Sequence, residues 1–253
     1  MDRMNADRLA AVMTDLRRHL NTCISGSRLL CKDGAAASIT GLPYAPFNSV
    51  WLEQPNPPVP AVATLLDEVA SAGVPFSLSL RPGSDAVLAD LAAERGMKSD
   101  GELPLMVLDA TAGVGAIRRA RGLAIRRLAP REGPVHAKVA AAAFGCPEEM
   151  FLPGPDLMWL DGLRCYVGEA DGRPVATALS VTAGEFTGIF NVATEPAYQG
   201  RGFGTAITAR AVADGVLAGT AWCWLQSSAE GYPVYRDLGF RTVETWTRWV
   251  SGS

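Results

Sequence analysis

The sequence predicts an α/β (α+β) fold with a mixed sheet, because segments with strand periodicity alternate with amphipathic helical segments along the chain. Its 253 residues are 48% hydrophobic and 19% charged, which is enough for one large or two small packed domains. The stretch ATAGVGA, residues 110–116, consists of small residues and interrupts the alternation. We therefore expect two domains, 1–111 and 112–253, that meet at this linker-like stretch.

The first half begins with an amphipathic helix over residues 5–20, where apolar residues recur at the helical period. The elements expected after it are a strand at 47–52, a helix at 61–72, a strand at 75–81, a helix at 84–95 and a strand at 103–109. Four prolines between residues 55 and 60 separate the first strand from its helix.

The second half opens with an alternating strand at 123–129 and a helix at 134–144. The elements expected after them are strands at 163–169, 174–182 and 186–194, a helix at 204–217, a strand at 221–227, a short helix at 231–237 and a strand at 240–250. We expect each half to form a mixed, mainly antiparallel sheet flanked by helices.

Composition excludes several classes of protein. A net charge of −3 argues against a protein that binds nucleic acid or anionic membrane, and no apolar run reaches the ~18–20 residues of a membrane span. The N-terminal segment lacks the apolar core of a signal peptide. Five cysteines without a CxxC pair and only two histidines indicate free thiols and no metal site. We expect a cytoplasmic protein, as monomer or homodimer, without metal, nucleic-acid or membrane partners.

The segment with the clearest chemistry joins the strand at 186–194 to the helix at 204–217. Its sequence, from Gln199 to Thr205, is QGRGFGT. Glycines let a backbone turn tightly and approach a ligand, and a helix N-terminus attracts phosphate. The segment lacks the Lys-Ser/Thr of a triphosphate-binding loop and the GxGxxG spacing of a dinucleotide-binding loop. It therefore indicates a phosphate-bearing ligand of another kind.

The same segment resembles the Q/R-x-x-G-x-G/A signature of the GNAT superfamily of acyl-CoA-dependent N-acyltransferases, as Gln199-x-x-Gly202-x-Gly204. A second block, YRDLGF at 235–240, resembles the Y-x-x-x-G-F block of that family. The order and spacing of elements agree with the family over about residues 123–250. The resemblance implies that residues 112–253 form a GNAT catalytic domain, with splayed central strands and a binding site for acetyl-CoA.

The resemblance also implies roles for individual residues. Backbone groups of Val192, Ala193 and Thr194 would bind the pantetheine arm, and amides near Val192 would polarise the thioester carbonyl. Tyr235 would act as the acid that protonates the departing thiolate. The pyrophosphate would be held by the loop and the first turn of its helix, at Gln199, Gly200, Arg201, Gly202, Phe203, Gly204 and Thr205.

Two further assignments stay open. Ser228, with Ser227 before it, would either bind the pantetheine or cap the following helix. The general base would be a glutamate or a water held by the protein. His136 lies in a segment that often lines the acceptor pocket in the family, although a lone histidine there is more often structural. The candidate carboxylates are Glu185, Glu195 and Glu230.

The two halves of the sequence match each other at an offset of 143 residues. Phe47-Asn48 then corresponds to Phe190-Asn191, and Gly96 to Gly239. We infer that residues 1–111 are a degenerate GNAT-like unit without a CoA site, as in tandem members of the family. The replacements that motivate this inference are Pro57 for Gly200, Pro58 for Arg201, Pro60 for Phe203 and Ala92 for Tyr235.

These observations lead to one leading interpretation and two alternatives. The leading one is an N-acetyltransferase that transfers an acetyl or short acyl group from acetyl-CoA to a primary amine of a small molecule or peptide. The reaction would be a direct attack in a ternary complex. The alternatives are a non-catalytic acyl-CoA-binding or sensing module and a structural scaffold that binds no CoA.

Overall fold

The structure is a computed structural model that describes residues 5–112, 120–152, 154 and 156–252. It divides into two compact units, the first made of Met1–Leu105 and Thr242–Ser253 and the second of Met106–Arg241. This division differs from the expected 1–111 and 112–253 mainly in the last strand, which belongs to the first unit. Part of the expected linker, residues 113–116, lies outside the described residues.

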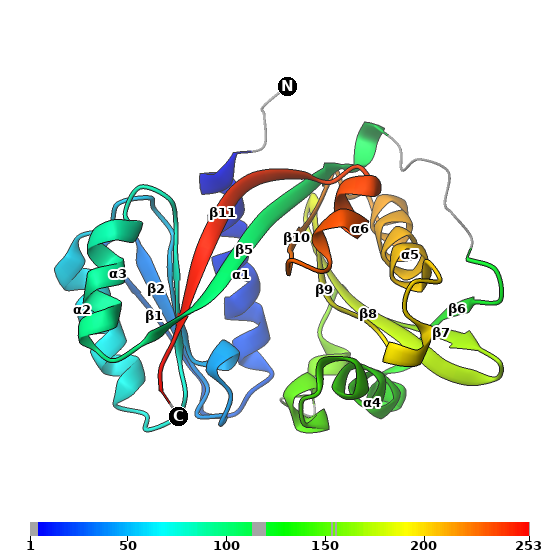
Figure 1. Ribbon diagram of the computed structural model, residues 1–253, viewed down its shortest axis with the longest axis horizontal. Helices are drawn as coiled ribbons and strands as arrows, with labels where there is room; N and C mark the ends of the chain where they lie inside the picture. The colour runs from blue at the N-terminus through cyan, green and yellow to red at the C-terminus, as the bar shows by residue number, and fades with distance from the viewer. Residues whose placement is uncertain (1–4, 113–119, 153, 155, 253) are drawn as a thin grey trace. The chain divides into compact units, whose positions relative to one another are not determined.

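The first unit is a sheet with helices on both faces (Figure 1). Its strands follow the order β1-β2-β3-β4-β11-β5. The pairs β1–β2, β2–β3 and β4–β11 are antiparallel, and β3 and β4 are parallel. Its elements are α1 (Ala6–Thr22), β1 (Arg28–Lys32), β2 (Ala35–Ile39), β3 (Ser49–Leu52), α2 (Val59–Ala70), β4 (Ser77–Leu80), α3 (Asp85–Glu94), the first part of β5 (Lys98–Asp109) and nearly all of β11 (Arg241–Val250).

The last strand joins this sheet because it pairs along β4, with Thr247 opposite Leu80 and Val250 opposite Ser77. The pattern of a strand in the sequence shows which residues alternate, but it does not show which strand they pair with. The assignment of residues 242–253 to the first unit was for this reason not visible in the sequence.

A hairpin of β1 and β2 was not expected from the sequence. Asp33 and Gly34 connect the two strands, and both have positive φ, 43° and 85°. Two consecutive residues of this kind form the tight turn that matches the twist of a hairpin, and Asp-Gly is a favoured pair for it. The dipeptide was therefore a usable signal for these two strands.

The second unit has the mainly antiparallel sheet that the sequence predicts, in the order β5-β10-β9-β8-β7-β6, with β9 and β10 parallel. Helices α4 and α5 lie on opposite faces of it (Figure 1). Its further elements are β6 (Ala124–Arg127), α4 (Gly133–Phe144), β7 (Leu163–Ala170), β8 (Arg173–Ala183), β9 (Phe186–Thr194), α5 (Phe203–Leu217), β10 (Trp222–Gln226) and α6 (Tyr232–Asp237).

Alternation along the strands gives the second unit two packed layers. Residues such as Ala176 and Ala178 of β8 pack with Ile207 and Ala211 of α5. Residues on the other face pack toward α4, among them Ala193 of β9. The sheet is thus held rigidly between two helices, and β9 lies near its centre.

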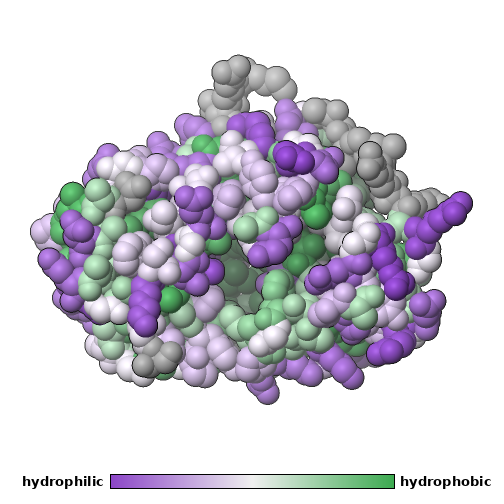
Figure 2. Space-filling view, in the orientation of Figure 1, coloured by the Kyte–Doolittle hydropathy of each residue, from purple (hydrophilic) through white to green (hydrophobic). Residues whose placement is uncertain are grey.

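Hydrophilic side chains gather over the part of the surface around β6 and β7 (Figure 2). Two arginines of β6 are ion-paired there. Arg126 lies 2.9 Å from Glu132 and 3.0 Å from Glu169, and Arg127 lies 2.7 Å from the buried Asp214. These two cations are therefore neutralised inside the second unit.

Among the described helices, none combines the length and the apolar character of a membrane span.

Candidate active site

The central strands β9 and β10 separate part of the way along their length. Their parallel pairing covers only Phe186 to Gly188 on β9 and Trp222 to Trp224 on β10. Strand β9 continues to Thr194 while paired with β8, and β10 continues to Gln226. The edge of β9 that faces away from β8 is therefore unpaired after Gly188. This separation confirms the splayed central strands that were expected.

Strand β9 carries a bulge within this unpaired stretch. Thr177 pairs with Ala193 and Leu179 with Phe190, so β9 has one more residue than β8 between these pairs. Asn191 adopts φ of 50°, a left-handed conformation that asparagine tolerates better than most residues. A bulge turns the backbone groups beside it, which commonly serves a functional site. Asn191 was not among the site residues expected from the sequence.

Alternation along β9 decides which backbone groups face the open edge. The Glu195 N–H donates to the Val175 carbonyl on β8, so the backbone of Ala193, two residues earlier, also points to β8. The backbone groups of Val192 and Thr194 then point the other way, into the separation. Of the three residues expected to bind pantetheine, Val192 presents both backbone groups unpaired, and Thr194 presents its N–H, since the Thr194 carbonyl accepts from the Gln199 side chain.

The glycine loop positions a row of unpaired amides. Gly200 and Gly202 have φ of 74° and 77°, and Gly202 is the residue that precedes α5. In the described part of the chain, the N–H groups of residues 200 to 205 donate to no protein acceptor; the first amide of the helix start that does so is Ala206, to the Gly202 carbonyl. Several amides at the positive end of a 15-residue helix make a site for a polyanion.

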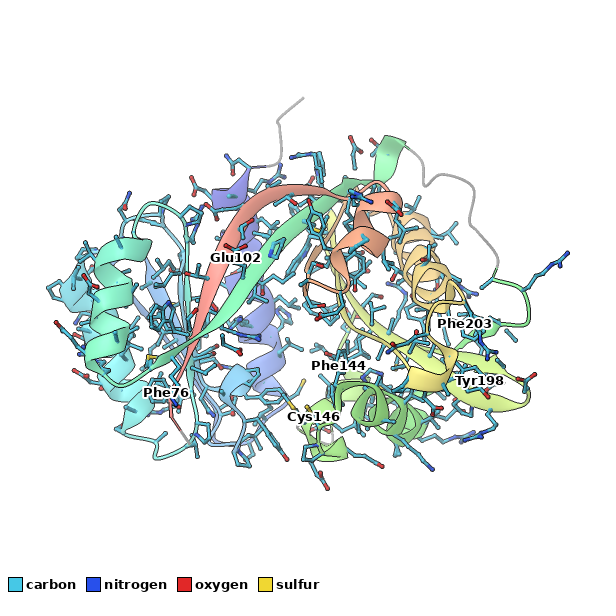
Figure 3. The ribbon with its side chains drawn as sticks, in the orientation of Figure 1. Phe76, Glu102, Phe144, Cys146, Tyr198 and Phe203 are labelled. Carbon is cyan, nitrogen blue, oxygen red and sulfur yellow. The ribbon has the colours of Figure 1, made fainter. Side chains whose placement is uncertain are left out.

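Side chains fix the loop at both ends. Phe203 is buried in the core of the second unit and stacks on Tyr198 with ring centroids 6.3 Å apart (Figure 3). The Arg201 guanidinium lies 4.9 Å from the centre of the Tyr198 ring. Gln199 donates from Nε2 to the Thr194 carbonyl at 3.2 Å. The side chains of Gln199 and Phe203 thus hold the loop against β9 and α5, which leaves its amides as the groups available to a ligand.

Tyr235 lies on α6 and is buried. Its ring packs edge-on against the ring of Phe240, with the ring centroids 6.0 Å apart. Burial raises the pKa of Tyr235 to about 12. Its hydroxyl has no hydrogen-bond partner among the described residues. A Cβ on Gly231 would lie 2.9 Å from the tyrosine ring and about 3.5 Å from the Ser228 hydroxyl. The tyrosine is thus a core aromatic residue that also carries an unpaired, fully protonated hydroxyl group.

Ser228 lies three residues before the N-cap residue, Gly231, of the helix that contains Tyr235. Its hydroxyl oxygen accepts the Gly231 N–H at 3.2 Å, while the Ser227 hydroxyl donates to the Ser228 carbonyl at 2.7 Å. That N–H belongs to the residue before α6, and no side chain of a described residue bonds to the helix start itself, so the capping role and the pantetheine role of Ser228 both stay predictions. The Ser228 hydroxyl also hydrogen-bonds to the Glu230 carboxylate.

The candidates for the general base lie in different places. Glu185 precedes β9 at the end far from the separation, Glu195 directly follows the open end of β9, and Glu230 is fully exposed before α6. Hydrogen bonds from its own backbone N–H and from the Ser228 hydroxyl hold the pKa of the Glu230 carboxyl below its usual value. A lower pKa makes this carboxylate a weaker base.

His136 is buried on the α4 side of the sheet. Its Nδ1 lies 2.7 Å from the Thr177 hydroxyl, and that hydroxyl donates to the Tyr166 carbonyl at 2.8 Å. Because the threonine proton is used there, the histidine Nδ1 must carry the proton of the pair, and Nε2 is left as a buried acceptor without a partner in the described residues. Burial lowers the pKa of His136 to about 4, so the ring is neutral at pH 7.

Comparisons with known proteins agree with this geometry. Residues 161–242 match the family model described as "Acetyltransferase (GNAT) domain". The match spans β7 to α6, and so includes the separated strands, the glycine loop and Tyr235. The chain therefore carries a GNAT acetyltransferase domain, and the reaction class of that domain identifies it as an acyltransferase. No curated protein sequence matches the chain.

Solved structures show the same fold over nearly the whole chain. A GCN5-related N-acetyltransferase from Kribbella flavida superposes with a TM-score of 0.73 at 20% identity, over 98% of this chain and 96% of that one. One from Sphaerobacter thermophilus gives 0.63 at 16% identity, over 90% and 82%. A tandem GNAT protein from the clavulanic acid biosynthesis pathway gives 0.57 at 14% identity, over 98% and 95%.

Proposed function

We propose that this protein is an N-acetyltransferase that transfers an acetyl or other short acyl group from acetyl-CoA to a primary amine of a small molecule or peptide. The observation that carries the proposal is the row of unpaired amides at residues 200–205, directly beside the unpaired edge of β9. A pyrophosphate and an amide-containing arm are the two chemical features of CoA that these groups match.

The residues present fit acetyl-CoA as the acyl donor. The amides of residues 200–205 supply the convergent donors that a pyrophosphate needs, and Arg201 adds a cation at the exposed side of the loop. Val192 and Thr194 offer backbone groups that a pantetheine amide pairs with as a further strand does. The bulge at Asn191 turns the neighbouring backbone, which supports a role of an amide near Val192 in polarising the thioester carbonyl.

Tyr235 supports the departure of the thiolate. With a pKa of about 12 the phenol keeps its proton at neutral pH, so it donates a hydrogen bond as negative charge develops on sulfur. The amine attacks the acyl carbon directly, the C–N bond forms and the C–S bond breaks, and the enzyme gains rate by holding both reactants together.

The first unit serves as a degenerate GNAT-like unit that binds no CoA. Its parallel strands β3 and β4 stay paired from Ser49 to Trp51 and from Ser77 to Ser79, so no open edge precedes α2. Pro58 is the residue before α2 and Pro60 lies in its first turn. Prolines carry no amide hydrogen, so this helix start has fewer donors for a phosphate than the start of α5. Ala92, at the position of Tyr235, is buried.

The proposal is tested by incubating the protein with acetyl-CoA and a panel of amines while released thiol is measured. The panel covers amino acids, polyamines, aminoglycosides and peptides with free N-termini, with Tyr235→Phe as the matched catalytic control. Thiol release that depends on one class of amine supports the proposal. Binding of acetyl-CoA without release with any amine would instead favour a non-catalytic acyl-CoA-binding module.

A further inference from the structure

One face of the sheet in the first unit is polar although it is buried. On β3 and β4, Val50, Leu52, Leu78 and Leu80 pack toward α2. The alternate residues point to the opposite face, where the Trp51 indole N–H donates to Thr14 of α1 at 2.9 Å. The polar residues of that face, all less than a tenth exposed, are Ser49, Ser77, Ser79 and Arg81. Burying hydroxyl groups costs free energy, and an apolar core needs none of them.

Arg17 extends from α1 onto this face and is held at two points. Its guanidinium donates to the Ser49 hydroxyl oxygen and lies 4.3 Å from the centre of the Trp51 ring. Stacking on an aromatic ring fixes the plane of a guanidinium and leaves its edge available for further hydrogen bonds. Arg17 as a residue is partly exposed, whereas its guanidinium group lies in a buried environment.

Arg17 differs from the other arginines of this face in its charge balance. Arg81 lies 2.7 Å from Asp7 and 2.9 Å from Glu244, and Arg248, opposite Ser79 on β11, lies 2.7 Å from Asp100. Arg17 has no carboxylate within ion-pair distance among the described residues. Burial lowers its pKa to about 10, and no neighbouring anion offsets this.

Hydroxyl donors lie beside this uncompensated cation. Ser49 accepts from Arg17, so its own proton is available. Ser79 pairs in register with Trp51 on the neighbouring parallel strand, and its hydroxyl makes no hydrogen bond in the described part of the chain. Ser49 lies two residues before Trp51 on the same face of β3, so Ser49, Trp51 and Ser79 are neighbours on one face of the sheet. The cluster therefore offers hydroxyl donors and one positive charge, and none of its three polar residues is an anion.

We propose that Arg17, Ser49 and Ser79 form a binding site for the carboxylate group of a small organic acid, within the first unit. A carboxylate only accepts hydrogen bonds, it is planar, and its single charge equals that of one guanidinium. A phosphate dianion would leave one negative charge unbalanced. The site is made entirely by α1, β3 and β4, so it is independent of the acyl-CoA site proposed for the second unit.

The site is tested with sodium acetate as the probe and the full chain as the target, in chloride buffer. Line broadening of the acetate methyl signal in NMR gives the affinity. Arg17→Gln should weaken acetate binding about tenfold or more, because a charge-assisted hydrogen-bonded pair is lost. Ser79→Ala should weaken it several-fold. Arg18→Gln is the matched control, since Arg18 is the adjacent arginine but is exposed and paired with Asp15, and its acetate affinity should equal that of the unaltered chain.

Three outcomes would overturn the proposal: no saturable broadening with acetate, equal acetate affinity in Arg17→Gln and the unaltered chain, or tighter binding of inorganic phosphate than of acetate. Ser79→Ala keeps the test decisive if Arg17→Gln does not fold, since it removes one hydroxyl and leaves Arg17 and Trp51 in place. Thermal unfolding of each variant separates a loss of the site from a loss of the fold. Thiol release from acetyl-CoA is measured in parallel, so that failure of the proposed activity is seen separately.

Discussion

The two parallel strand–helix–strand segments of the molecule differ in where their strands stop pairing. In the first unit, β3 pairs with β4 as far as Trp51 and ends one residue later. In the second unit, β9 pairs with β10 only as far as Gly188 and then continues for six residues. The same arrangement of elements thus gives a closed sheet in one case and an open backbone edge in the other. The site depends on this local end of pairing rather than on the fold as a whole.

Two asparagines that the proposed offset of 143 residues aligns, Asn48 and Asn191, show the same contrast. Asn48, before β3, is fully buried, and its side chain accepts from the Thr40 and Gly41 amides and donates to the Leu42 carbonyl. Asn191, within β9, instead has a left-handed backbone and forms the bulge. One asparagine stabilises a loop through its side chain, and the other shapes a strand through its backbone.

The largest effect is expected at Tyr235, which the proposed offset of 143 residues aligns with Ala92 of the first unit. Tyr235→Phe should keep acetyl-CoA affinity and lower turnover about a hundredfold or more, since a positioned acid contributes about 10²–10⁴ in rate. Steady-state kinetics at saturating substrates measures this, with Tyr44→Phe in the first unit as the control. Unchanged turnover would remove Tyr235 from the mechanism and leave it as a core residue.

The two units also differ in how they bury a titratable group, and this predicts a pH dependence of stability. Arg81 of the first unit stays charged between carboxylates, whereas His136 of the second is buried neutral. Its pKa, about 4 when folded, lies below the ordinary 6.5, so the unfolded chain binds the proton first as the pH falls. The stability contributed by the neutral ring is present above pH 6.5 and is lost toward pH 4.

Urea unfolding at pH 7 and pH 5 measures this contribution. Between these values the unaltered protein should lose about 2 kcal/mol through His136. The free energy of unfolding of His136→Gln should depend correspondingly less on pH. His19→Gln, on the exposed side of α1, should keep the pH dependence of the unaltered protein. An unchanged slope in His136→Gln would mean that the buried ring does not control acid stability.

A smaller effect is expected in the glycine loop, the counterpart of the prolines before α2. Gly202→Val should weaken acetyl-CoA binding about tenfold, because a branched residue at φ of 77° costs about 1–2 kcal/mol and shifts the amides. Gly204→Val tests crowding without that strain, since a Cβ there lies 3.8 Å from the Thr194 hydroxyl. Calorimetry on folded variants measures their affinity for acetyl-CoA. Wild-type affinity in both variants would mean that the loop is a turn without a role in binding.

Much of the candidate site could be predicted from the sequence because its backbone geometry depends on residue types with special conformational properties. The glycines at 200 and 202 have the positive φ that only glycine adopts easily, and the block around Tyr235 places a phenol on a short helix. The bulge at Asn191 and the early end of the β9–β10 pairing could not be read, since both depend on register between strands. The pairing of β11 with β4 could not be predicted from the sequence for the same reason.

The smallest effect is expected from introducing glycines at the start of α2 in the first unit, where the number of CoA molecules bound per chain should not change. This is the strictest test of the comparison between the two units. Pro58→Gly together with Pro60→Gly returns an amide at each position. The β3–β4 pair nevertheless stays closed from Ser49 to Trp51, so no edge becomes available for the pantetheine arm, and amides alone do not complete the site. Titration calorimetry should give one CoA per chain for the unaltered protein and for this variant alike. A stoichiometry near two in either protein would show that the first unit binds CoA without a strand separation, and the open edge of β9 would then no longer explain where the ligand binds.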